Sequence, residues 1–266
     1  MASQVTELFN NIWKQYLSVT PSAKKIHQLL GNGKDVINDH VAYRTFNHPK
    51  INLVQVAKGL LALGYTECGQ YDFSAKKLDA KHFEHTDSAM PKVFISELRV
   101  EEFSSEVQEI ITGLIAQLPD NVSDSADFLY SGRLWEISSK DYYTLLNVSE
   151  YAAWLAAWGY RANHFTVSIN HLAGYEDLEL VNTTLKDAGY ELNTNGGEIK
   201  GDEVVKLEQS STLADKAPVD FSDRTIEIPS CFYEFAKRYP MVNGELYTGF
   251  VAASADKIFD STNAKS

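Results

Sequence analysis

The chain has 266 residues, of which 44% are hydrophobic and 12% aromatic, and this is enough apolar material for a sizeable core. Its 24 Lys and Arg against 36 Asp and Glu give a formal net charge of -12, which disfavours nucleic acid as a partner and favours a small molecule. The amino-terminal stretch lacks the pattern of a signal peptide, and no segment has the apolar length that spans a bilayer. We therefore expect a cytoplasmic protein that binds neither nucleic acid nor a membrane. The sequence does not set an oligomeric state.

Only two cysteines occur, Cys68 and Cys231. They are too few for a disulfide framework or a thiolate metal cluster. Any chemistry is therefore expected to rest on nitrogen and oxygen groups.

Apolar residues at three-and-four spacing predict an amphipathic helix over residues 3–17, and a second helix follows Pro21. The pattern then changes to one typical of strands. The elements expected next are a strand at 40–46, a helix at 51–63 and strands at 65–73, 77–85 and 92–98. This order is βαβββ.

The same order recurs in the second half of the chain, so an internal repeat is indicated. Its expected elements are a strand at 164–170, a helix near 178–188 and strands near 204–209, 224–228 and 232–237. Gly64 follows His40 by 24 residues and Gly189 follows His164 by 25, and each glycine stands where the predicted helix ends. We expect an α+β fold with two βαβββ modules.

The chain is expected to form a single structural unit, because no long flexible linker separates the copies. Its parts are a helical N-terminus at 1–36, a first module at 37–100, an inserted helical segment at 101–160 and a second module with a C-terminal segment at 161–266.

Each copy places a histidine at the start of its first strand, His40 and His164, and pairing of the copies can bring the two imidazoles together. Glu227, in an alternating apolar run at 224–228, supplies a carboxylate that is costly to bury unless something pairs with it. Two histidines and one carboxylate suit non-haem Fe(II), which keeps open positions for a chelating substrate and O2. Zinc or nickel could use similar ligands.

A simpler interpretation is that His40 and His164 are hydrogen-bonded interior histidines. Glu227 would then pair with Arg224 or Lys237. Two rivals also remain for the metal: His171 for the second histidine, and Glu97, the first-copy counterpart of Glu227, for the carboxylate.

Arg44 shares a strand face with His40, since side chains alternate along a strand. Their Cα atoms would lie roughly 13 Å apart at the usual rise per residue. That separation suits a short dicarboxylate with a 2-oxo acid end on the metal and a distal carboxylate on the guanidinium, and Ala42 between them leaves room. Arg44 could instead form an ordinary ion pair with one of the acidic residues.

The sequence resembles the 2-oxoadipate dioxygenase/decarboxylases, also called D-2-hydroxyglutarate synthases, over most of its length. The segments that carry the resemblance are NDHVAYRTF at 38–46, KLDA at 77–80, RANHF at 161–165, EQSST at 208–212, RTIEIP at 224–229 and ADKIFDST at 255–262. The resemblance implies a vicinal-oxygen-chelate-like half-barrel.

It also implies an iron site of His40, His164 and Glu227, with Arg44 holding the distal carboxylate of 2-oxoadipate and Val251 contributing to the pocket. The implied reaction is Fe(II)-dependent conversion of 2-oxoadipate and O2 to 2-hydroxyglutarate and CO2, a step of lysine breakdown. Two alternatives stay open. One is a glyoxalase-like lyase, isomerase or hydrolase that uses the same ligands on a small oxo acid, and the other is a non-catalytic ligand-binding protein.

Overall fold

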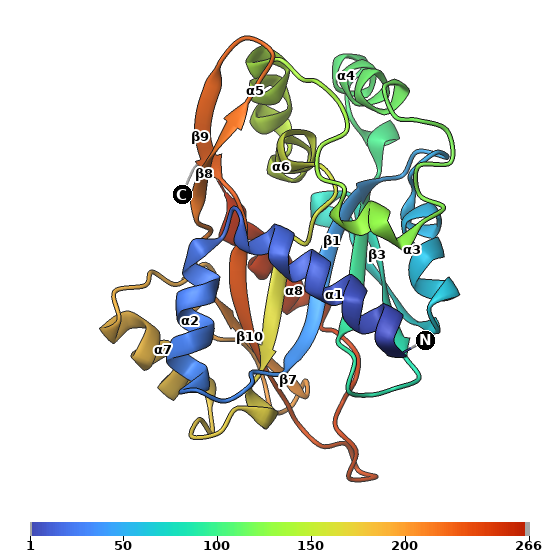
Figure 1. Cartoon of the computed structure of the whole chain (residues 1–266). Coiled ribbons are helices and arrows are strands. Elements are labelled where there is room, and N and C mark those ends of the chain that lie inside the picture. Colours follow the sequence, from blue (N-terminus) through green and yellow to red (C-terminus); the bar gives the residue numbers. More distant parts are fainter. Residues whose placement is uncertain (1, 264–266) are drawn as a thin grey trace.

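The computed structural model describes residues 2–263, and its centre is an eight-stranded mixed sheet that curls into a half-barrel (Figure 1). Its strands are β1 (Asn38–Phe46), β2 (Tyr65–Phe73), β3 (Leu78–His85), β4 (Lys92–Leu98), β5 (His164–Ser168), β6 (Lys200–Asp202), β7 (Leu207–Ser211) and β10 (Phe232–Arg238). Their order across the sheet is β2-β3-β4-β1-β5-β10-β7-β6.

The sheet has an internal two-fold pattern. In the first half β1 is parallel to β4, and in the second half β5 is parallel to β10. The remaining strands of each half add antiparallel to these, and β1 pairs antiparallel with β5 at the centre. The two halves therefore meet through their first strands, and the expected α+β fold of two βαβββ modules is confirmed.

The module helices are α3 (Leu53–Ala62) and α7 (Leu178–Asp187). Each begins at a side-chain cap, Asn52 or Asp177, that accepts a hydrogen bond from a backbone N–H of the first turn. Each is followed by a glycine with positive φ, +98° at Gly64 and +86° at Gly189. These are the two glycine stops that the sequence predicts.

The amino-terminal helices α1 (Ala2–Leu17) and α2 (Pro21–Gly31) cover the outer face of the central strands (Figure 1). The Trp13 ring meets the Phe165 ring of β5 edge-on at 4.8 Å, and the Tyr16 hydroxyl donates a hydrogen bond to the Phe232 carbonyl of β10. These contacts hold the outer faces of β5 and β10. Because side chains alternate along a strand, His164, the neighbour of Phe165, faces the inside of the half-barrel.

The inserted segment supplies α4 (Ser105–Ala116), α5 (Ser139–Val148) and α6 (Glu150–Trp158). Every residue of α6 is buried except its first, Glu150. Helices α5 and α6 lie at one end of the half-barrel, at the top of Figure 1, beside a two-stranded sheet of β8 (Lys216–Asp220) and β9 (Thr225–Pro229).

This two-stranded sheet corrects one expected element of the second module. The strand predicted at 224–228 exists as β9, but in the described chain it pairs with β8 and stands outside the eight-stranded sheet. The three later strands of the module are β6, β7 and β10. Alternation of apolar and polar residues is the same in a surface hairpin as in a half-buried sheet strand, so it does not show which sheet a strand joins.

The C-terminal segment returns to the inner side of the half-barrel. Helix α8 (Ala252–Ile258) packs near β2, β6 and β7, and the single turn η5 (Phe259–Thr262) packs near α6 and α8. None of the helices within residues 2–263 combines the length and apolarity needed to cross a bilayer.

Replacement of Gly159 by alanine tests the packing of α6. Gly159 ends α6 with φ 66° and ψ −149°, and a Cβ there would lie 2.4 Å from the Gly132 carbonyl oxygen. We expect Gly159→Ala to lower the free energy of unfolding by about 2 kcal/mol or more. The measurement is urea denaturation. Gly113→Ala is the matched control, because Gly113 lies within α4 with open space around it, and it should stabilise by about 0.5–1 kcal/mol.

Candidate metal centre

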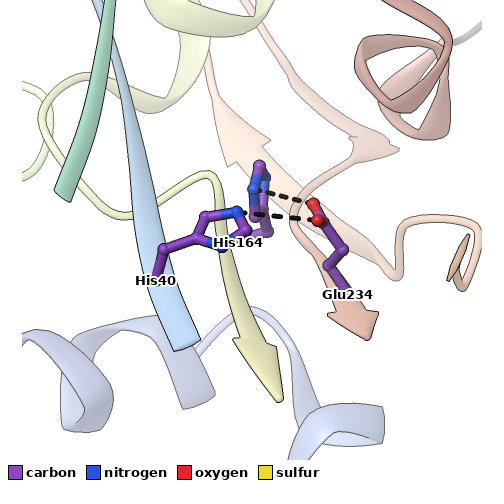
Figure 2. A group of neighbouring side chains, drawn as sticks. All are labelled: His40, His164 and Glu234. Atoms are coloured by element: carbon purple, nitrogen blue, oxygen red, sulfur yellow. Dashed lines mark ion pairs between the residues drawn. The ribbon is translucent and has the colours of Figure 1, made fainter. Parts of the chain in front are cut away.

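Three side chains converge inside the half-barrel: His40 from β1, His164 from β5 and Glu234 from β10 (Figure 2). Their exposed fractions are 2%, 5% and 0%. His164 Nε2 lies 3.0 Å from Glu234 Oε2, and His40 Nε2 lies 3.5 Å from Glu234 Oε1. One ligand atom from each residue falls within 4.8 Å of the others.

The register of the three neighbouring strands brings these side chains together. Thr166 of β5 is paired with His40 on one side and with Glu234 on the other. His164 lies two residues before Thr166 on the same strand and so points to the same face. The expected convergence of the two histidines therefore follows from antiparallel pairing of β1 and β5.

The partners of the Nδ1 atoms fix which imidazole nitrogen carries hydrogen. His40 Nδ1 lies 2.8 Å from Asp39 Oδ1, and Asp39 is itself held by Arg238 through contacts of 2.7 and 2.9 Å. His164 Nδ1 lies 3.1 Å from Asn163 Oδ1. With both Nδ1–H groups donating outward, the two Nε2 lone pairs face the Glu234 carboxylate.

The three groups of the centre shift one another's pKa values. Burial opposes ionisation of Glu234, but the neighbouring imidazoles and the Gln209 amide outweigh burial and lower its pKa. Burial lowers the pKa of His164, although the neighbouring Glu234 carboxylate opposes this shift. The Gln209 amide donates to Glu234 Oε1 at 2.6 Å, and the Thr166 hydroxyl, 3.0 Å from His40 Nε2, can donate to that nitrogen.

Two imidazole lone pairs and one carboxylate that meet in a buried place repel one another unless a proton or a metal cation lies between them. The donor set of two nitrogens and one oxygen is one that divalent transition metals accept. The residues therefore fit a divalent metal, held by His40, His164 and Glu234.

The carboxylate expected from the sequence, Glu227, is not part of this group. It lies on β9, opposite Pro218 of β8, and is exposed. The alternation that suggested a buried carboxylate instead turns Ile228 inward and Glu227 outward. The assignment of Glu227 to the centre is wrong, and Glu234 takes its place.

The two rival residues also lie elsewhere. Glu97 accepts a hydrogen bond from the Leu53 amide at the start of α3, on the opposite face of the sheet from His40. His171 is exposed beyond the end of β5, where its Nδ1 meets the Ser168 hydroxyl.

The sequence does hold a signal for Glu234. It is the one charged residue in Phe232–Ala236, where every neighbour is aromatic or small and apolar. A run that is apolar on both faces is typical of a central strand, and an acidic residue there needs a partner of opposite charge.

Arg44 shares the inner face with His40, as the strand alternation predicts, but it already has an acidic partner. Its Nη1 donates to Glu150 Oε1 at 3.0 Å and to Oε2 at 3.3 Å, while Nη2 donates to the Thr262 hydroxyl at 2.8 Å. Its Nε has no hydrogen-bond partner among residues 2–263. The ion-pair alternative for Arg44 thus describes this structure.

A narrow cavity of about 20 Å³ adjoins the centre, which is room for about one water molecule. Its wall is largely apolar and is formed by His40, Ala42, Phe94, His164, Gln209, Glu234, Phe250, Ala255, Ile258 and Phe259. The expected pocket residue Val251 is not among them. Its neighbour Phe250 packs edge-on against the His40 ring at 4.8 Å, and Val251 caps α8 instead.

Removal of the Glu234 charge should empty the centre. We expect Glu234→Gln to weaken binding of a divalent metal such as Mn(II) by more than about 100-fold, since a first ligand should matter at least as much as the partners that orient ligands. Equilibrium dialysis measures this. Glu227→Gln is the control and should bind metal like the wild type; the reverse result would restore Glu227 as the ligand.

Asp39→Asn tests the orientation of His40. The amide keeps a single, uncharged acceptor oxygen for the two partners of Asp39, which are His40 Nδ1–H and Arg238, so metal affinity should fall by about 10–100-fold. Titration calorimetry with the same metal checks it. An unchanged affinity in a correctly folded variant would show that Asp39 serves only the ion pair.

The chain is similar to proteins of known family and known structure. The profile of the 2-oxoadipate dioxygenase/decarboxylase family matches residues 2–246. A rice (Oryza sativa subsp. japonica) 2-oxoadipate dioxygenase/decarboxylase is 34% identical over 96% of this chain and 78% of its own length.

Two solved structures are closely similar. A rice hydroxyglutarate synthase in complex with 2-oxoadipate has a TM-score of 0.93 at 33% identity, covering 99% of this chain and 93% of that one. A Shewanella frigidimarina protein, provisionally assigned as a hydrolase, has a TM-score of 0.90 at 60% identity, covering 94% and 98%. On the family match and these likenesses, the chain belongs to the 2-oxoadipate dioxygenase/decarboxylase family and has its vicinal-oxygen-chelate-like fold.

Proposed function

We propose that this protein is a non-haem Fe(II) enzyme that converts 2-oxoadipate and O2 to 2-hydroxyglutarate and CO2. The observation that carries the proposal is the buried group of His40, His164 and Glu234 in a chain of this family. Two imidazoles and one carboxylate leave positions on one side of the metal, as oxygenases of the non-haem iron class require. When bound, the iron would accept the 2-oxo acid as a chelate and make O2 reactive toward it.

Arg44 is the proposed partner of the distal carboxylate. It lies on the same strand face as His40, four residues along β1, and its buried guanidinium lies 5.7 Å from the ring centre of Phe259, which lines the metal cavity. A guanidinium fork binds a carboxylate through two parallel hydrogen bonds, which fixes both the position and the orientation of a dicarboxylate. The rice relative solved with 2-oxoadipate supports this class of substrate.

The surrounding residues keep water away from the reacting end of the substrate. The rings of Phe94, Phe250 and Phe259 line the cavity beside the centre. A dry wall strengthens the electrostatic contacts inside and limits hydrolytic side reactions. Arg238 and Asp39 hold His40 so that its Nε2 faces the metal position.

The cavity must widen before a six-carbon acid can enter, since it now holds about one water molecule. Part of the wall belongs to α8 and η5 and not to the sheet, and this segment contributes Ala255, Ile258 and Phe259. We propose that this segment moves when the substrate binds. A cytoplasmic location and a place in lysine breakdown belong to the same proposal.

Oxygen consumption tests the function directly. The protein is loaded with Fe(II) without oxygen and then mixed with 2-oxoadipate and O2. We expect one CO2 and one 2-hydroxyglutarate for each O2 consumed, and no uptake with Glu234→Ala. Turnover without O2 would favour a lyase or hydrolase with the same ligands. Tight ligand binding without turnover would favour a binding protein.

A further inference from the structure

The ion pair of Arg44 and Glu150 lies beside Phe259, at the boundary between two hollows of the molecule. One is the narrow cavity at the metal centre, and the other is a hollow of about 490 Å³ lined partly by Glu150 and Tyr151. Phe259 lines both. The Arg44 side chain is 1% exposed, whereas the Glu150 side chain is 21% exposed. The pair therefore has a buried cation on one side and an accessible carboxylate on the other.

Loss of the anion that pairs with Arg44 would cost much free energy. Its guanidinium lies 4.9 Å from the ring centres of Tyr151 and Trp154 and 5.7 Å from that of Phe259. These ring faces attract the cation, but by less than the cost of leaving a buried charge without an anion. Glu150 supplies that anion while no substrate is present.

Glu150 can leave the pair far more easily than Arg44 can. Among the residues that the structure describes, its carboxylate accepts hydrogen bonds from Arg44 alone. It is the first residue of α6, where the helix terminus favours a negative charge, and the backbone there is already capped by Ser149. Its side chain borders the larger hollow, so it has room to turn toward solvent.

Arg44 also keeps donors ready for a second carboxylate. Thr262 holds Nη2 in place, and Nε is buried with no acceptor among residues 2–263. Release of Glu150 would free Nη1 as well. Two carboxylates on one buried guanidinium would leave a surplus negative charge, so exchange is favoured over addition.

We propose that Glu150 is an exchangeable counter-ion of Arg44, which the distal carboxylate of a 2-oxo dicarboxylic acid displaces on binding. The inference rests on the proposed function, because it takes Arg44 as the carboxylate partner. The exchange keeps Arg44 neutralised both with and without substrate. A 2-oxo acid with an apolar tail brings no anion to replace Glu150, so Glu150 contributes to selection for dicarboxylates.

Glu150→Gln tests the exchange, since the amide keeps the size of the side chain and removes its charge. The metal-loaded protein is titrated without oxygen by calorimetry, first with 2-oxoadipate and then with 2-oxohexanoate, which lacks the distal carboxylate. We expect the Kd for 2-oxoadipate to fall by about tenfold. In the variant, the state in which Arg44 is free of Glu150 and can bind the substrate carboxylate is no longer rare. The Kd for 2-oxohexanoate should not fall, and the ligand-free variant should melt at a lower temperature.

Two controls accompany this variant. Glu102→Gln removes a carboxylate that lines the same hollow but pairs with Arg99, and it should leave the Kd for 2-oxoadipate unchanged. In Arg44→Gln, adding Glu150→Gln should give no gain. Weaker or equal binding of 2-oxoadipate by the single Glu150→Gln variant would overturn the exchange and make Glu150 a fixed support of Arg44 or a bystander.

The Arg44→Gln variant distinguishes failure of the exchange from failure of the proposed function. If Arg44→Gln weakens binding of 2-oxoadipate but Glu150→Gln does not strengthen it, only the exchange fails. If the metal-loaded wild type does not bind 2-oxoadipate, or Arg44→Gln binds it equally well, the assigned substrate or the role of Arg44 fails, and the exchange fails with it.

Discussion

The Nε2 atoms of His40 and His164 and the carboxylate of Glu234 face one another inside the half-barrel, and all three are electron-pair donors. Such a group is costly to bury by itself, because the Gln209 amide and the Thr166 hydroxyl offset the repulsion only in part. The fold holds it in place through strand register, with Thr166 between His40 and Glu234. Much of the remaining structure supports that register, including the aromatic contacts of α1 on the outer face of β5.

The supporting contacts reach from the centre to the chain's C-terminal part. Arg238, at the end of β10, pairs with Asp39 and also donates to the carbonyl oxygens of Tyr247 and Gly249. Phe250 follows directly and packs on His40. Arg238 therefore links the orientation of His40 to the segment that closes the cavity. The order of the centre and the order of that segment depend on the same contacts.

Local pattern in the sequence was enough to predict the first module, because its strands and helix follow one another in both sequence and space. It also predicted the second histidine, since the repeat places His164 as it places His40. It failed for the carboxylate. Glu227 and Glu234 both stand in short apolar runs, and only the pairing of β8 with β9 shows that the first run lies outside the main sheet. The partner of Arg44 was equally hidden, because Glu150 lies 106 residues further along the chain.

The two-fold pattern of the sheet has a consequence for the shape of the coordination sphere. Glu234 stands two residues after Phe232, the partner of His164 across the parallel pair. In the first half, His40 is paired with Lys92, and Phe94 stands two residues after Lys92. Phe94 lines the cavity beside the histidines. A symmetric molecule would offer four protein ligands to an ion, whereas this one has a hydrocarbon ring in the fourth place, which would leave one sector of a bound ion free for exchangeable ligands.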